Sequence, residues 1–162
     1  MLWRAAGEPA VEGVVNPFTD VKESDFFYTA VLWAVQNGIT NGISATEFDP
    51  FGETNRAQAV TFLWRWMGQV KTNNGNSFAD VQEGQWYTDA INWAVNCGIT
   101  NGQTATEFGI EAVCNRAHMV TFLYRADMIE TYAFVLQTND ADAVMGTVAM
   151  EATGPFRSGA AH

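Results

Sequence analysis

The tripeptide Asn55-Arg56-Ala57 occurs a second time, unchanged, as Asn115-Arg116-Ala117. Each copy precedes an apolar run, and Asn is a favoured N-cap residue, so each tripeptide predicts the start of a helix. Arg56 and Arg116 would then lie in the first turn, where the positive end of the helix dipole disfavours a cation by a few tenths to about 1 kcal/mol. An anionic ligand bound jointly by the arginine and the helix N-terminus would explain this placement.

The tripeptide belongs to a longer internal repeat. Phe18 and Phe78, like Trp33 and Trp93, are separated by 60 positions, and the register holds with no insertion. A fixed period of this kind indicates a tandem array of one supersecondary unit.

Each unit shows the same order of signals. A Phe-x-Asp-Val segment at 18–21 or 78–81 is followed by apolar residues at helical spacing, which end at Gly38 or Gly98. A turn-rich loop then leads to the helix that the tripeptide begins. The expected fold is therefore all-α, with tandem helix–loop–helix repeats.

The repeat divides the chain into five segments. Leu2-Trp3-Arg4 resembles Leu63-Trp64-Arg65, so residues 1–15 are interpreted as the end of a preceding repeat and a linker. Residues 16–68 form the first repeat, 69–77 a linker, 78–127 the second repeat, and 128–162 a C-terminal segment of unknown role. We expect the chain to be a piece of a longer protein.

Composition excludes several classes of function. Of the 162 residues 48% are apolar, which is ample for a packed core, and the net charge is −10. A chain this acidic lacks the basic face that nucleic acid requires. No apolar run approaches the roughly 20 residues of a membrane span. Because no catalytic or metal-ligand motif is found, we predict no enzymatic activity, no metal site and no cofactor. Cys97 and Cys114 form either a disulfide or two reduced thiols.

Several motifs together resemble the S-layer homology domain, a repeat found on exported bacterial proteins. The resemblance covers roughly residues 16–126, with residues 1–7 similar to the tail of an earlier copy. Its motifs occur in the order of that family: Phe-x-Asp-Val, the aromatic pairs Phe26-Phe27 and Trp86-Tyr87, Trp-Ala-Val, Gly-Ile-Thr-Asn-Gly, Thr-Glu-Phe, and the Arg-Ala helix start leading to Thr-Phe-Leu.

The resemblance implies a fold, a location and a ligand. It implies an all-helical pseudo-threefold bundle at the bacterial cell surface, in the cell wall or S-layer. It also implies non-covalent attachment to cell-wall polysaccharide, an anionic glycan that often carries a pyruvate ketal with a free carboxylate. The ligand-binding residues implied by the family motifs are Arg56, Arg116, Asp20, Asp80, Trp86, Phe26, Gly42 and Gly102.

The chain departs from the family pattern in three respects. Asn replaces the usual Thr before each Arg, Gln58 or His118 replaces the usual Glu, and two full repeats are present instead of three. The alternative for both arginines is a structural role, with the side chain lying over a Trp or Phe ring or paired with Glu53. Asn55 and Gln58 have the spacing of a capping box.

A protein-interaction or self-association module on an exported surface protein is the alternative function. Tyr28 and Leu32 are apolar where the second repeat has Thr88 and Asn92. We therefore expect these two side chains to pack against something additional, such as a neighbouring repeat, the C-terminal segment or a protein partner.

Overall fold

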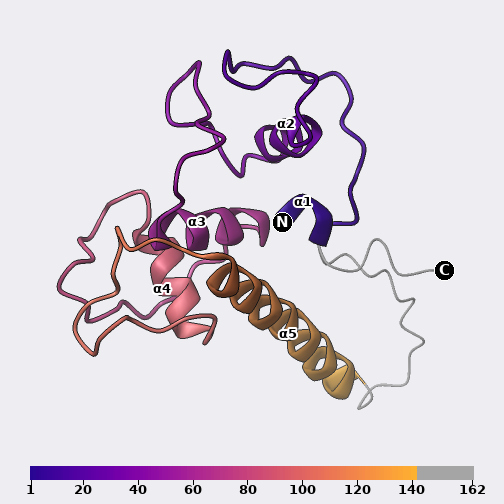
Figure 1. The fold of residues 1–162 in the computed structure, drawn as a ribbon. Helices are drawn as coiled ribbons and strands as arrows, with labels where there is room; N and C mark the ends of the chain where they lie inside the picture. The colour runs from indigo at the N-terminus through magenta and orange to yellow at the C-terminus, as the bar shows by residue number, and fades with distance from the viewer. Residues whose placement is uncertain (142–162) are drawn as a thin grey trace.

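The chain consists of helices joined by long loops. The computed structural model describes the backbone of residues 1–141 and the side chains of residues 1–129 (Figure 1). Its helices are α1 (Leu2–Ala5), α2 (Tyr28–Gln36), α3 (Arg56–Trp66), α4 (Thr88–Asn96) and α5 (Arg116–Ala141). Residues 1–141 contain no strand, and only an isolated bridge pairs Asn55 with Val113. The all-α prediction is confirmed.

Each repeat is a helix, a loop and a second helix, as predicted. The first helix of each repeat ends before a glycine of positive φ, 65° at Gly38 and 70° at Gly98. In the first repeat the N–H of Ile39 then donates to the carbonyl of Ala34 at 2.8 Å, which satisfies one of the last carbonyls of α2. Glycine therefore ends both helices where the sequence predicted.

The predicted capping box is present at the start of α3. The N–H of Gln58 donates to Asn55 Oδ1 at 2.8 Å, and the N–H of Asn55 donates to Gln58 Oε1 at 2.9 Å. At the start of α5 only half of this arrangement remains, because His118 replaces Gln58 and its N–H donates to Asn115 Oδ1 at 2.9 Å. His118 thus serves as a capped helix residue.

The main core forms where one repeat meets the next. The second helix of repeat 1, α3, packs against α4, the first helix of repeat 2, and the two lie side by side in Figure 1. The largest buried side chains of this cluster include Leu63, Trp64, Ile91, Trp93 and Phe108. A helix pair therefore buries its apolar faces across the repeat boundary rather than only within one repeat.

Residues 1–9 reproduce the end of α3 in detail, 61 positions earlier. The indole N–H of Trp3 donates to the carbonyl of Pro9 at 3.0 Å, and that of Trp64 donates to Val70 at 2.8 Å. Gly7 and Gly68 follow their helices at φ 84° and 87°. The turn α1 also packs against α2, as α3 packs against α4. The interpretation of residues 1–15 as the end of a preceding repeat and a linker stays a prediction.

The helix α5 extends past the second repeat as far as Ala141 and runs across the boundary placed between residues 127 and 128. The five-segment division and the pseudo-threefold bundle stay predictions. The apolar run at 144–150 and the polar tail at 154–162 lie outside the described residues. Over residues 1–141, no helix combines the length and apolarity needed to cross a bilayer.

Candidate functional site

Asp20 and Asp80, both predicted to bind ligand, close the loop of their own repeat. The Asp20 carboxylate accepts hydrogen bonds from the N–H of Phe48 at 2.9 Å and of Asp49 at 2.7 Å. Asp80 accepts from the three consecutive N–H groups at 108–110, at 2.8 to 3.2 Å. The bond from Phe48 lowers the pKa of Asp20; at Asp80 burial acts to raise the pKa, but the hydrogen bonds outweigh it and lower the pKa.

Gly42 and Gly102, also predicted site residues, lie where each loop passes the phenyl ring that opens its repeat. A Cβ at Gly42 would meet the ring of Phe18, and a Cβ at Gly102 would meet the ring of Phe78 and come within 2.6 Å of the carbonyl of Glu107. Both glycines therefore leave room for an aromatic ring of their own repeat, and their role is to let the loop close.

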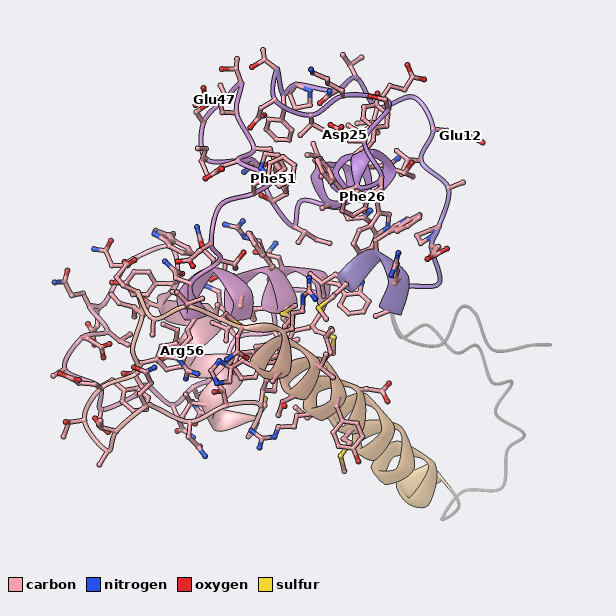
Figure 2. All side chains as sticks on the ribbon, viewed as in Figure 1. Glu12, Asp25, Phe26, Glu47, Phe51 and Arg56 are labelled. Atoms are coloured by element: carbon pink, nitrogen blue, oxygen red, sulfur yellow. The ribbon has the colours of Figure 1, made fainter. Side chains whose placement is uncertain are left out.

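Arg56 is buried between the two repeats, with 5% of its surface exposed. Its Nε donates to the carbonyl of Phe108 at 3.1 Å, and its Nη2 donates to the carbonyl of Asn101 at 2.7 Å and to Thr100 Oγ1 at 3.2 Å. The guanidinium carbon lies 4.7 Å from the centroid of the Phe108 ring and 5.8 Å from that of Phe122. Figure 2 shows Arg56 among the side chains of the second repeat.

The first N–H groups of α3 also donate to backbone carbonyls of the second repeat. The N–H of Arg56 donates to the carbonyl of Ala112 at 2.8 Å, and the N–H of Ala57 donates to Ile110 at 3.3 Å. Carbonyl oxygens and ring faces of repeat 2 thus take the place that we considered for an anionic ligand. Burial lowers the pKa of Arg56, while the negative charge of the Asp80 carboxylate acts to raise it. The structural alternative, a ring-stacked arginine, is the arrangement found here.

Arg116 has a different environment from its counterpart. It is exposed and lines an open groove of about 420 Å³ between the start of α5, α1 and the first repeat. Phe26, which is 89% exposed, and Phe27 line the same groove, which we call the Arg116 groove. Among the described residues Arg116 is the only charged side chain in its lining. Two of the predicted site residues, Arg116 and Phe26, therefore line the same groove.

Aromatic rings form one wall beside this groove. The rings of Phe26 and Phe27 meet edge to face with centroids 5.0 Å apart, and Phe27 meets Phe51 edge to face at 5.8 Å. Figure 2 shows Phe26 and Phe51 beside α2. Phe51 is 85% exposed and was not predicted from the sequence, because the second repeat carries Glu111 at the matching position.

A second pocket, of about 500 Å³, lies beside the loop of repeat 1. It is lined by Thr40, Gly42 and Phe48 among others, and by Trp86 from the second repeat, so we call it the Thr40 pocket. Trp86 is 52% exposed. The two pockets share Phe48 and Phe62 in their walls.

Leu32, Tyr28 and the two cysteines were also considered from the sequence. Leu32 is only 5% exposed, so it is buried within the chain and does not offer a surface to a partner, while Tyr28 is partly buried. In the second repeat the matching Asn92 accepts a hydrogen bond from Asn76 at 2.6 Å, so the segment before that repeat covers this face of α4. Both cysteines are reduced.

The residues that receive Arg56 were missed by sequence reasoning. Thr100 and Asn101 belong to the repeated Gly-Ile-Thr-Asn-Gly motif, and Phe108 to the repeated Thr-Glu-Phe motif. Both motifs recur in the first repeat, and this recurrence could have indicated that their residues have a structural role. What the sequence did not show is that the motifs of one repeat accept a side chain from the repeat before it.

Comparison with known proteins agrees with this architecture. The S-layer homology domain matches residues 17–60 and 77–120, more than half of the chain. A cell surface protein of Thermoanaerobacter kivui is 28% identical over 140 residues, 81% of this chain and 18% of that protein. The S-layer protein sap of Bacillus anthracis is 30% identical over 129 residues, covering 75% and 16%.

An endoglucanase of a Bacillus species is 29% identical over 110 residues, which are 68% of this chain and 12% of that enzyme. The chain thus spans less than a fifth of the length of these relatives. The shared part is a non-catalytic anchoring module that occurs in S-layer proteins and also in proteins named as enzymes. On the two matched repeats and the helical architecture that they form, this chain belongs to the S-layer homology domain family and is located at the bacterial cell surface.

Proposed function

We propose that the chain attaches its parent protein to the cell wall by binding an anionic polysaccharide in the Arg116 groove. The observation that carries this proposal is the pairing of an exposed arginine with an exposed aromatic ring in one open groove. A guanidinium binds carboxylate through two parallel hydrogen bonds, and the face of an aromatic ring packs against the apolar face of a sugar. A pyruvate ketal on the glycan supplies the carboxylate.

Charge favours this groove over the Thr40 pocket. Arg116 is the one charged side chain among the described residues of the groove. In the Thr40 pocket two acids, Asp49 and Glu53, outnumber Arg65, whose guanidinium is bonded to Ile39, so an anion is disfavoured there. The chain as a whole carries a net charge of −10, so an anionic glycan must be held by a local cation against an unfavourable field. Arg56 is already bonded within the protein and does not contribute a free guanidinium.

The same groove gives the glycan a second point of contact. Phe26 exposes 89% of its surface, and the edge-to-face contact with Phe27 orients its ring. Asp20, Asp80, Gly42 and Gly102 act on the loops rather than on the glycan, and Trp86 lies in the neighbouring pocket. Leu32, on which the protein-partner alternative depended, is buried.

Titration calorimetry with purified wall polysaccharide tests the proposal. Parent chain, Arg116→Ala, Arg116→Lys and Phe26→Ala are compared, each against the pyruvylated glycan and against the same glycan after acid removal of the ketal. We expect Arg116→Ala to weaken binding by about tenfold or more, because a charge-assisted pair is lost, and Arg116→Lys to weaken it less.

Arg4→Ala is the matched control, since Arg4 is an exposed cation whose ion pair with Glu8 lies at the surface. It removes the same charge and should bind as the parent does. Equal affinity of the parent and Arg116→Ala, or equal affinity for the two forms of the glycan, would contradict the proposal.

A further inference from the structure

The four residues that hold the side chain of Arg56 have counterparts of the same type in the first repeat. Arg56 donates to Thr100 Oγ1 and to the carbonyl of Asn101, and it lies against the rings of Phe108 and Phe122. Sixty positions earlier the chain carries the same four residue types, at Thr40, Asn41, Phe48 and Phe62. The first repeat thus has every residue type that receives an arginine in the second.

These four counterparts together line the Thr40 pocket. Its volume of about 500 Å³ is large enough for a guanidinium and its aliphatic stem, and Asp49 and Glu53 in its wall favour a cation. Of the arginines among the described residues only Arg65 lines it. Arg65 Nη1 donates to the carbonyl of Ile39 at 3.0 Å, and Arg125 makes the same 3.0 Å bond to Ile99 in the second repeat. Arg65 therefore has the role of Arg125, not that of Arg56.

The turn α1 indicates the kind of helix that would supply an arginine to the Thr40 pocket. The helix that carries Arg56, α3, packs against α4 and reaches the loop that follows it. The turn α1 packs against α2 and matches the end of α3, down to the indole hydrogen bonds of Trp3 and Trp64. A full-length helix of the same kind ending in α1 would carry its first residue to the loop that follows α2.

We propose that the Thr40 pocket is a receptor for the helix-start arginine of a repeat that ends in α1, within a longer form of this chain. The guanidinium donates to Thr40 Oγ1 and to the carbonyl of Asn41, and it stacks between Phe48 and Phe62. This proposal does not depend on glycan binding, because Arg116 and Phe26 do not line the Thr40 pocket.

A short extension tests it. Residues 1–8 align with residues 62–69. Adding a copy of residues 53–61 directly before Met1 therefore lengthens α1 into a helix with the sequence pattern of α3. Two extended chains are compared, one with arginine and one with alanine at the added copy of position 56. From the strength of hydrogen bonds to a charged donor, we expect the arginine form to have a folding equilibrium constant roughly tenfold to a hundredfold larger in denaturant titrations.

A matched pair of variants identifies the pocket. Thr40→Val in both extended chains should reduce the advantage of arginine over alanine, whereas Thr100→Val, which removes the contact to Arg56, should leave that advantage unchanged. A second slowly exchanging arginine Nε–H signal, beside that of Arg56, should be seen by nitrogen-15 NMR in the arginine form.

Three outcomes would overturn the proposal. One is equal stability of the arginine and alanine forms, and another is an arginine advantage that Thr40→Val does not reduce. The third is concentration-dependent self-association of the unextended chain that Arg116→Ala abolishes, since the occupant would then be a second copy.

Discussion

The guanidinium carbon of Arg56 lies 4.7 Å from the centroid of the Phe108 ring, so a side chain of the first repeat is stacked on a side chain of the second. The same arginine donates a 3.1 Å hydrogen bond to the carbonyl of Phe108. One residue thus contacts both the ring and the backbone of its partner, 52 positions later. The stability of the pair of repeats should depend strongly on this contact.

Replacing Arg56 should therefore destabilise the chain far more than replacing its counterpart. Arg56→Ala leaves the carbonyl of Phe108 without its donor and removes one of the two donors to the carbonyl of Asn101, so we expect a loss of roughly 2–4 kcal/mol in the free energy of unfolding. Arg116→Ala, at an exposed position, should change it by about 0.5 kcal/mol or less. Chemical denaturation measures both. Equal losses in the two variants would contradict the assigned difference between the arginines.

A methyl group at Gly102 should also destabilise the second repeat. In Gly102→Ala the new Cβ would meet the Phe78 ring and lie 2.5 Å from the carbonyl of Thr104, so we expect a loss of about 1–3 kcal/mol in the free energy of unfolding. Gly75→Ala is the control, because a Cβ there meets no atom within 4 Å. Thermal unfolding of the two variants compares them, and a tolerated Gly102→Ala would show that the loop can move away from the ring.

Acid should weaken the fold through Asp80. Burial acts to raise its pKa, but the hydrogen bonds from residues 108–110 lower it further, so the folded-state pKa lies below the unfolded-state value of about 4. The ionised carboxylate then contributes stability above pH 4, and that contribution is lost as the pH falls through the folded-state pKa.

The Asp80→Asn variant isolates this contribution. At pH 7 it should unfold at a lower denaturant concentration than the parent, and the difference should shrink as the pH falls below about 4. Denaturant titrations across this range measure the effect. A difference that stays constant with pH would show that the charge of Asp80 is not what orders the loop.

The two thiols should react slowly with alkylating reagents. Burial raises the pKa of Cys97 and of Cys114, although the charge of Arg56 lowers the latter in part. Because the thiolate is the reactive form, both should be alkylated more slowly at about pH 8 than in the unfolded chain, with rates that rise with pH. Iodoacetamide labelling followed by peptide mass spectrometry gives the rate at each residue. Equal rates in folded and denatured chains would contradict the raised pKa values.

The helix starts and ends could be predicted from the sequence because they depend on residues that are close together along the chain. The capping box of Asn55 and Gln58, the glycine stops at Gly38 and Gly98, and the buried Trp33 and Trp93 follow from propensity and periodicity. The correspondence of residues 1–7 with the end of a helix also follows, because it rests on sequence identity within the chain.

The candidate site was only partly accessible, because identical motifs have different surroundings. Arg56 and Arg116 stand in the same tripeptide, yet the first is buried by the loop of the next repeat and the second is exposed. No local pattern distinguishes the two, since the difference depends on which loop follows in space. The loop functions of Asp20 and Asp80 were missed for a similar reason, because their acceptor role spans 28 to 30 positions.

The number of positions between hydrogen-bonded residues has a consequence for the order in which the protein folds. The first repeat closes on itself through the bond of Asp20 with Phe48 and the bond of Arg65 with Ile39, whose residues are 28 and 26 positions apart. The bonds of Arg56 span 44 to 52 positions and need both repeats. Since synthesis begins at the N-terminus, the first repeat can close before the second exists. The junction forms only after Phe108 has been made, so assembly proceeds in the direction of synthesis. The side chain of Arg56 can make its hydrogen bonds only once the loop of the second repeat exists.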